Sequence, residues 1–186
     1  MTMSWYVLFV KTGDENRSVY EVNKVWQIDG IRPFIPMFDA KFRNSGKVFL
    51  EKRRLFPGYV FIETEMSGIE FYMTIRRLVV RSDHMLKILR YGNMDSDCSF
   101  VMKEEERQAF LKLCNNDRCV EISQGFIEGD QIVITDGPLF GFESLIKRIN
   151  RHKMEATLEV ELMGDKREVI VGLEVVKKVA NPMVFI

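Results

Sequence analysis

The clearest pattern in the chain is an alternating apolar run that follows a Pro-Gly pair. Residues 55–62 read Leu-Phe-Pro-Gly-Tyr-Val-Phe-Ile. On a strand, Tyr59 and Phe61 share one face, and the β-branched residues that alternate with them share the other. A two-layer domain can place helices on only one face of an antiparallel sheet. The other apolar face must therefore find a partner outside the domain or remain an exposed patch.

The segments before this run predict a strand and its first covering helix. Residues 4–11 are apolar without polar alternation, which is typical of a central strand covered on both faces. Gly13 and Asp14 then offer a helix start, and apolar residues recur at helical spacing up to Trp26. Gly30 offers the C-terminal stop.

A basic hairpin is predicted between these elements and the alternating run. Residues 32–38 contain two prolines, so they can form only an edge strand or an irregular connector. Residues 39–54 then form the predicted hairpin, in which six basic side chains face only two acidic ones, Asp39 and Glu51. The basic residues are Lys41, Arg43, Lys47, Lys52, Arg53 and Arg54.

In the rest of the chain, helical patterns give way to short alternating strands. Residues 68–77 suggest a short helix, and residues 86–91 suggest another strand. Residues 103–114 predict a clearer helix, because three glutamates occupy its first turn, where the helix dipole favours anions. From Gly125 onward, short period-two strands are separated by Gly, Asp and Asn turns, which is typical of a small all-β barrel.

The bulk composition restricts the function without naming it. The 186 residues suit one domain or two small ones. Lys and Arg total 27 and balance 27 Asp and Glu, so nucleic-acid contact would have to come from local clusters. No signal peptide opens the chain and no apolar run is long enough to span a bilayer, which predicts a cytoplasmic protein.

The candidate chemistry is sparse. Cys98, Cys114 and Cys119 form no Cys-x-x-Cys pair, and His84 and His152 lie far apart, so neither a metal site nor a cofactor is expected. No nucleophile-base pair and no phosphate-binding loop is visible. The interpretation is a binding protein and not an enzyme.

The C-terminal segment carries a recognisable motif. Residues 129–143 read Gly-Asp-Gln-Ile-Val-Ile-Thr-Asp-Gly-Pro-Leu-Phe-Gly-Phe-Glu and resemble the KOW motif. Combined with the upstream Trp5-Tyr6 strand and its helix, and with the Phe-Pro-Gly-Tyr of residues 56–59, the chain resembles the NusG family. The resemblance covers nearly the whole chain. It implies an α+β fold with a ferredoxin-like N-terminal (NGN) domain over residues 1–115, a flexible linker over 116–124, and a small SH3-like KOW β-barrel over 125–180.

The resemblance also implies partners. In the NusG family the N-terminal domain binds the clamp helices of RNA polymerase, and the matching residues here are Phe9, Phe56, Pro57 and Tyr59. They belong to the apolar face of the predicted sheet that the helices of the same domain do not cover. The basic hairpin would lie near the upstream fork of the transcription bubble, where it would touch the displaced non-template DNA strand. The protein would act as a monomer.

One stretch departs from the family pattern. Where relatives usually keep a glycine two residues after the motif's Phe142, followed by an acidic strand, this chain has Ser144 and then a basic hairpin. Clustered cations on a barrel edge can neutralise phosphates and release counterions. This indicates a specialised paralogue, similar to LoaP-type antiterminators, whose barrel binds a structured leader RNA. The candidate RNA-binding residues are Lys147, Arg148, Arg151 and Lys153, with Lys166 and Arg167 on a neighbouring turn.

Two other functions stay open at this point. A general NusG elongation factor would use the Phe142 side of the barrel to bind a ribosomal protein or the termination factor Rho. A ribosomal or rRNA-binding KOW protein would not contact polymerase. The sequence also leaves open whether the two domains dock against each other in an autoinhibited form, although the alternating strands favour a β-barrel.

Overall fold

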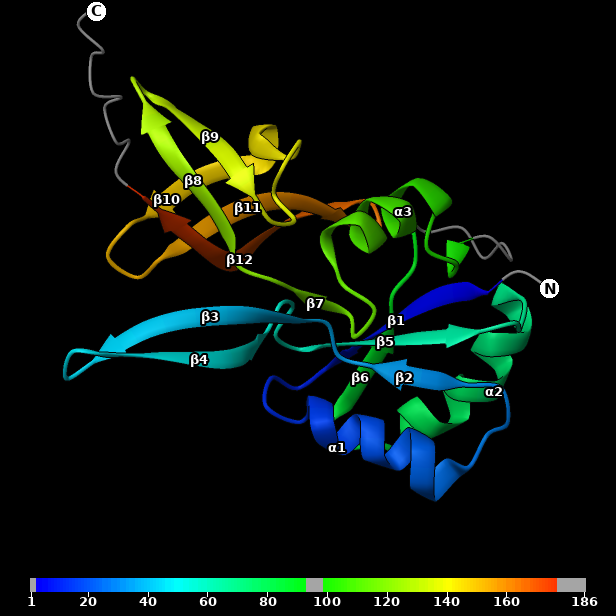
Figure 1. The fold of residues 1–186 in the computed structure, drawn as a ribbon. Coiled ribbons are helices and arrows are strands. Elements are labelled where there is room, and N and C mark those ends of the chain that lie inside the picture. The colour runs from blue at the N-terminus through cyan, green and yellow to red at the C-terminus, as the bar shows by residue number, and fades with distance from the viewer. Residues whose placement is uncertain (1–2, 93–98, 177–186) are drawn as a thin grey trace, which may run out of the picture.

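The computed structural model describes residues 3–92 and 99–176 (Figure 1). Cys98 and the last residues of the predicted barrel, 177–180, lie outside the described residues, as does the side chain of Arg43. The mixed α+β architecture predicted from the sequence is confirmed. An N-terminal sheet with helices on one side is followed by a curled C-terminal sheet in the place expected for the barrel.

The N-terminal sheet has the strand order β2-β5-β1-β6, and each neighbouring pair is antiparallel. The prediction that the proline-rich segment could form an edge strand is confirmed, because β2 pairs only with β5. Its strands are β1 (Ser4–Val10), β2 (Arg32–Phe34), β5 (Tyr59–Thr64) and β6 (Met85–Ile88).

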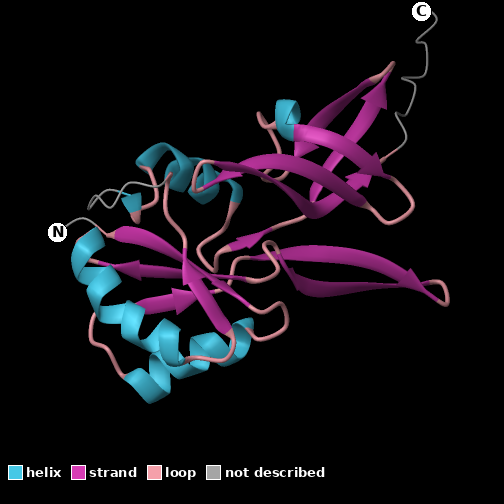
Figure 2. Cartoon of the chain, turned by 180° about the vertical axis from the view of Figure 1, so that it is seen from behind, coloured by secondary structure: helices cyan, strands magenta, loops and turns pink. Residues whose placement is uncertain are grey.

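Helices cover one face of this sheet (Figures 1 and 2). On that face Tyr6 stacks on Phe71 of α2, with ring centroids 3.9 Å apart, and Val60 and Ile62 are fully buried. The covering elements are α1 (Glu15–Tyr20), the π-helical segment η1 (Glu21–Trp26) and α2 (Gly68–Arg81). The predicted helix after Gly13 is therefore confirmed, and the helix predicted over 68–77 extends to Arg81.

The opposite face of the sheet is aromatic and is covered by the rest of the chain. Trp5 and Phe61 lie on it and contact Phe110 of α3 (Glu104–Leu113), with ring centroids 5.5 and 5.6 Å apart. The same core cluster continues into buried residues of the C-terminal sheet, such as Leu158 and Val171. The face that needed a partner outside its own two layers thus finds one within the same chain.

A long hairpin extends from the N-terminal domain alongside the C-terminal sheet (Figures 1 and 2). It consists of β3 (Met37–Asn44) and β4 (Lys47–Arg54), as the sequence predicts. The short strand β7 (Cys119–Val120) pairs parallel with the start of β3. The segment 116–124 therefore contains a buried, paired strand where a flexible linker was expected, because both residues of β7 join the hydrophobic interior.

The C-terminal sheet has the order β10-β11-β12-β8-β9. It begins at Ser123, two residues before the expected start of the barrel, while the division into two domains stays a prediction. Its elements are β8 (Ser123–Glu128), β9 (Gln131–Asp136), the 3-10 turn η3 (Glu143–Leu145), β10 (Ile146–Asn150), β11 (Glu155–Leu162) and β12 (Asp165–Val175).

The turn that precedes β5 is held by a buried carboxylate. Gly58 has a φ of +85°, a conformation that favours glycine. Its backbone N–H donates to Oε1 of Glu15 at 2.7 Å, and the N–H of Gly13 donates to Oε2 at 2.9 Å. Glu15 is fully buried and pairs with Nε of Arg54 at 3.1 Å. One side chain of α1 therefore fixes the Phe-Pro-Gly-Tyr turn, the loop after β1 and the base of the hairpin.

We expect Glu15→Ala to lower the free energy of unfolding by about 3 kcal/mol, because it leaves two backbone donors and a guanidinium without their buried acceptor. Urea unfolding followed by the fluorescence of the buried Trp5 measures this change. Glu51→Ala is the matched control, since Glu51 is an exposed carboxylate whose pair with Arg53 is also exposed. It should change the value by less than about 0.5 kcal/mol. Equal effects of the two substitutions would contradict the role given to Glu15.

Candidate functional site

The structure brings together the four residues that the sequence assigns to polymerase binding. Phe9 and Tyr59 are register partners on β1 and β5, and their ring centroids lie 5.2 Å apart. Phe56 follows at 6.5 Å from Tyr59 in an edge-to-face arrangement. Pro57 is exposed beside them. We call these four residues the aromatic face.

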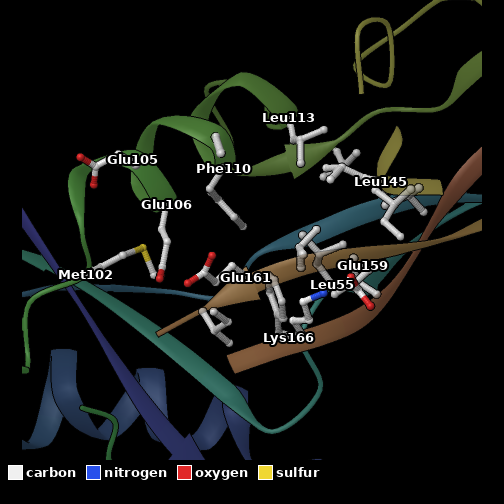
Figure 3. A pocket seen from close by; sticks show the side chains of 18 residues that line it. Leu55, Met102, Glu105, Glu106, Phe110, Leu113, Leu145, Glu159, Glu161 and Lys166 are labelled. Carbon is white, nitrogen blue, oxygen red and sulfur yellow. Dashed lines mark hydrogen bonds and ion pairs between the residues drawn. The ribbon is translucent and has the colours of Figure 1, made fainter. Parts of the chain in front are cut away.

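The C-terminal sheet covers part of this aromatic face. Phe56 is only 5% exposed and lines an apolar cavity of about 370 Å³ between α3, β11 and β12. In Figure 3, Phe110 and Leu113 point from α3 into this cavity, and Leu55 lies across it. Side chains from both halves of the chain line it. The cavity therefore lies at the contact between the two halves.

The other members of the aromatic face lie opposite the hairpin formed by β11 and β12. Pro57 lines a hollow together with Val169 and Ile170 of β12. Phe9 and Tyr59 line a second hollow with residues of the β11–β12 turn. There the guanidinium carbon of Arg167 lies 5.9 Å from the centroid of the Tyr59 ring.

Polar contacts hold the two sheets in this arrangement. Glu106 of α3 accepts hydrogen bonds from the backbone N–H groups of Met163 and Gly164, at 2.9 and 3.1 Å. On the hairpin side, two ion pairs join the β3–β4 hairpin to the C-terminal sheet, Lys41–Glu174 at 2.7 Å and Arg53–Glu155 at 3.3 Å. Gly172 of β12 approaches the hairpin so closely that a Cβ atom there would lie 2.4 Å from the carbonyl oxygen of Asp39.

Tyr91 supports the same contact from the loop after β6. Its ring lies against the β11–β12 turn, since a Cβ atom on Gly164 would meet it at 3.1 Å. Its hydroxyl accepts the backbone N–H of Lys103 at 2.9 Å. Burial raises the pKa of Tyr91 well above its ordinary value, so the hydroxyl is neutral at physiological pH. The loop before α3 is thus anchored next to the turn that Glu106 binds.

The predicted DNA-proximal hairpin divides into engaged and free cations. Lys41 and Arg53 bind carboxylates of the C-terminal sheet, and Arg54 binds Glu15. Lys47 and Lys52 form no ion pair with any other described residue. The hairpin also exposes apolar side chains that the sequence reasoning did not single out: Phe42, Val48, Phe49 and Leu50.

The predicted RNA-binding residues divide in the same way. Four are paired with carboxylates of the same sheet: Lys147 and Lys166 with Glu159, Arg148 with Glu168, and Arg167 with Asp165. The hydrogen bond with Glu159 raises the pKa of Lys166, and the same bond lowers the pKa of Glu159. Arg151 and Lys153, on the turn between β10 and β11, are exposed and form no ion pair within the described part of the chain.

The predicted partner-binding residue of the barrel, Phe142, is half-buried. It packs against the core cluster that includes the C-terminal sheet. Phe140, two residues earlier, is 68% exposed. The aromatic side chain that is free for a partner at this turn is therefore Phe140, which sequence reasoning did not select.

Two structurally central residues could not be found from the sequence. Glu15 and Glu106 both sit in the first turn of a helix, where an acidic residue is ordinary because it favours the dipole. Nothing in the local pattern shows that each carboxylate binds a distant backbone. Among the residues that the structure describes, no group of three or more His, Cys, Asp or Glu could hold a metal ion. No helix in the same part of the chain is long and apolar enough to cross a membrane.

Comparisons with known proteins agree with this fold. A family model described as "Transcription termination factor nusG" matches residues 3–111. The transcription termination/antitermination protein NusG of Treponema pallidum is 25% identical over 189 residues, covering 95% of this chain and 98% of that protein. The NusG protein of Bacillus subtilis is 24% identical over 179 residues, covering 94% and 96%.

A solved structure described as "Domain interaction in Thermotoga maritima NusG" superposes with a TM-score of 0.52. It is 22% identical and covers 94% of this chain and 95% of that chain, a likeness that concerns the fold alone. The sequence matches assign the family. The family model spans more than half of the chain, and the NusG relatives align along nearly all of it. This protein therefore belongs to the NusG family.

Proposed function

We propose that this protein is a transcription elongation and antitermination factor that binds the clamp helices of RNA polymerase through its N-terminal domain. The observation that carries the proposal is the aromatic face. Phe9, Phe56, Pro57 and Tyr59 gather at one end of the N-terminal sheet and face the C-terminal sheet. The names of its relatives, transcription termination/antitermination proteins, support the same role.

The docked arrangement would keep this binding surface closed. Phe56 is buried against the C-terminal sheet, so the clamp helices can reach it only after that sheet moves away. The apparent affinity for polymerase then equals the intrinsic affinity multiplied by the fraction of molecules that are open. Docking is therefore an autoinhibitory contact, and the residues between β7 and β8 are the hinge on which the barrel would swing.

The finer proposal is an operon-specific factor, similar to LoaP-type antiterminators, that acts in the cytoplasm and is recruited by a structured leader RNA. Arg151 and Lys153 support it, because their charges are exposed and pair with no carboxylate in the part of the chain that the structure describes. Lys147, Arg148, Lys166 and Arg167 would contribute only by exchanging their carboxylate partners for phosphates.

The second candidate is a general NusG factor whose barrel binds a ribosomal protein or Rho. The exposed ring of Phe140 beside the half-buried Phe142 favours this candidate, since an aromatic side chain on a barrel turn offers a partner an apolar anchor. Both candidates share the polymerase contact. They differ in what the barrel binds once it has left the aromatic face.

We expect Glu106→Ala to raise the affinity of the full chain for RNA polymerase by about tenfold, because the loss of two hydrogen bonds to a charged acceptor weakens docking by about 1.4 kcal/mol. Surface plasmon resonance with immobilised core polymerase measures the change. Glu104→Ala is the matched control: Glu104 is an exposed carboxylate on the same helical turn and pairs with Arg107 of its own helix. It should leave the affinity unchanged.

A second substitution tests whether the aromatic face makes the contact. Tyr59→Ala in the Glu106→Ala background should abolish the gain and weaken binding below the wild-type level. Tyr20→Ala removes a tyrosine that is 62% exposed on α1 and should have no effect. Unchanged polymerase binding in the Tyr59 variant, with circular dichroism showing an intact fold, would rule out the proposed surface. No polymerase binding by the wild-type chain or by Glu106→Ala would favour a KOW protein that works without polymerase.

Genome-wide occupancy separates the two candidate functions. An operon-specific factor should occupy polymerase on a few transcription units, because a structured leader RNA recruits it only there. A general factor should follow polymerase on most transcripts. Chromatin immunoprecipitation of the tagged full chain, compared with the occupancy of polymerase itself, measures this directly, and a uniform profile would overturn the operon-specific proposal.

A further inference from the structure

A basic cleft of about 680 Å³ lies between the β3–β4 hairpin and the turn that joins β10 to β11. Figures 1 and 2 show these two segments, far apart in sequence, side by side. The hairpin contributes three residues, the turn region contributes five, and β12 contributes two. The lining residues are Lys41, Phe42, Arg53, Arg151, His152, Lys153, Met154, Glu155, Glu174 and Val175.

Two of the four Lys and Arg side chains in this cleft pair with carboxylates, and the other two have no carboxylate partner in the described part of the chain. Its two carboxylates, Glu155 and Glu174, are already engaged by Arg53 and Lys41 from the opposite wall. The remaining cations, Arg151 and Lys153, are exposed and have no carboxylate partner among the described residues. The ion pairs therefore hold the two walls together, and the free positive charge lies along the turn.

The opposite wall presents an aromatic ring. Phe42 is 37% exposed and is stacked on Phe49, with ring centroids 5.4 Å apart and ring planes inclined by 19°. Phe49 is itself 42% exposed, so this aromatic pair lies on the surface of the hairpin and outside the core. A pair of exposed rings that support each other forms a rigid platform for a planar ligand.

We propose that the basic cleft binds a single strand of nucleic acid, with its phosphates on Arg151 and Lys153 and a base stacked on Phe42. Cations that follow a backbone, combined with an aromatic platform for bases, are the physical requirements of single-strand binding. Stacking on Phe42 requires an unpaired base with a free face, so a duplex does not satisfy the site. An acidic peptide would use the charges but would gain nothing from the ring.

The site is complete only in the docked arrangement, because one wall belongs to each half of the chain. A strand that contacts both walls binds the docked form preferentially and stabilises it. This inference rests on the proposed nucleic-acid role of the β10–β11 turn and adds the hairpin as the second wall. It brings together two basic segments that the sequence assigned to different ligands, the non-template DNA strand and the leader RNA.

The test uses the full chain without polymerase, titrated into 5′-fluorescein-labelled ten-nucleotide oligo-dT and oligo-U and followed by fluorescence anisotropy at several salt concentrations. Arg151→Ala/Lys153→Ala should weaken binding and reduce the slope of log K against log salt by about 1.4, since each lost phosphate contact removes about 0.7 for a single strand. Phe42→Leu should weaken binding about tenfold and leave the slope unchanged. The tighter of the two oligonucleotides identifies DNA or RNA as the ligand.

The matched control is Lys24→Ala/Arg77→Ala, which removes two exposed cations from the helical side of the molecule and should leave affinity and slope unchanged. An equal loss in this control would overturn the site in favour of unspecific attraction. If Phe42→Leu leaves the affinity for the oligonucleotides unchanged, the proposed site is wrong and the β10–β11 turn binds the strand without the hairpin. Failure of the wild-type chain to bind either strand at low salt would overturn the cleft, while the polymerase measurement with Glu106→Ala would still decide the proposed function separately.

Discussion

The packing of the C-terminal sheet on the aromatic side of the N-terminal sheet is the interaction on which the rest of the structure depends. The helices α1 and α2 cover one face, so Trp5, Phe61 and the neighbouring apolar side chains need a second cover. Here α3 and the strands β11 and β12 supply it within one continuous core. Apolar burial contributes roughly 25 cal/mol per Å² to stability. An uncovered face would therefore lose this free energy and would bind other apolar surfaces. The surface that stabilises the closed chain is the same one that an open chain would offer to polymerase.

The polar contacts around this core contribute less to the free energy of docking than the burial of apolar surface does. Lys41–Glu174 and Arg53–Glu155 are partly exposed pairs, which typically contribute less than about 1 kcal/mol each. Glu106 fixes the register by binding two backbone groups of the β11–β12 turn. In our proposals the closed form completes the nucleic-acid cleft and the open form exposes the polymerase surface. Nucleic acid and polymerase would then bind opposite forms of the chain. Binding of either one would lower the affinity for the other by the same factor.

Local patterns in the sequence predict the elements but not their assembly. The period-two strands, the proline-rich edge strand and the glutamate-rich α3 are confirmed because each depends on neighbouring residues. Alternation at residues 59–62 also predicts that one face needs a partner. Which segment covers that face depends on contacts such as Glu106 with Met163 and Glu15 with Gly58, which join residues whose local settings are ordinary. The strand within the expected linker was missed because two residues of β7 carry too little pattern.

Hydrogen exchange at the backbone N–H groups of Met163 and Gly164 tests the central claim most directly, because Glu106 accepts both only when the two sheets are docked. Mass spectrometry of the full chain, alone and with saturating RNA polymerase, follows peptides that contain this turn. A closed form that opens for polymerase requires slow exchange in the free protein and faster exchange once polymerase is bound. Rapid exchange in the free protein, or protection that persists on polymerase, would contradict a closed form that opens for its partner.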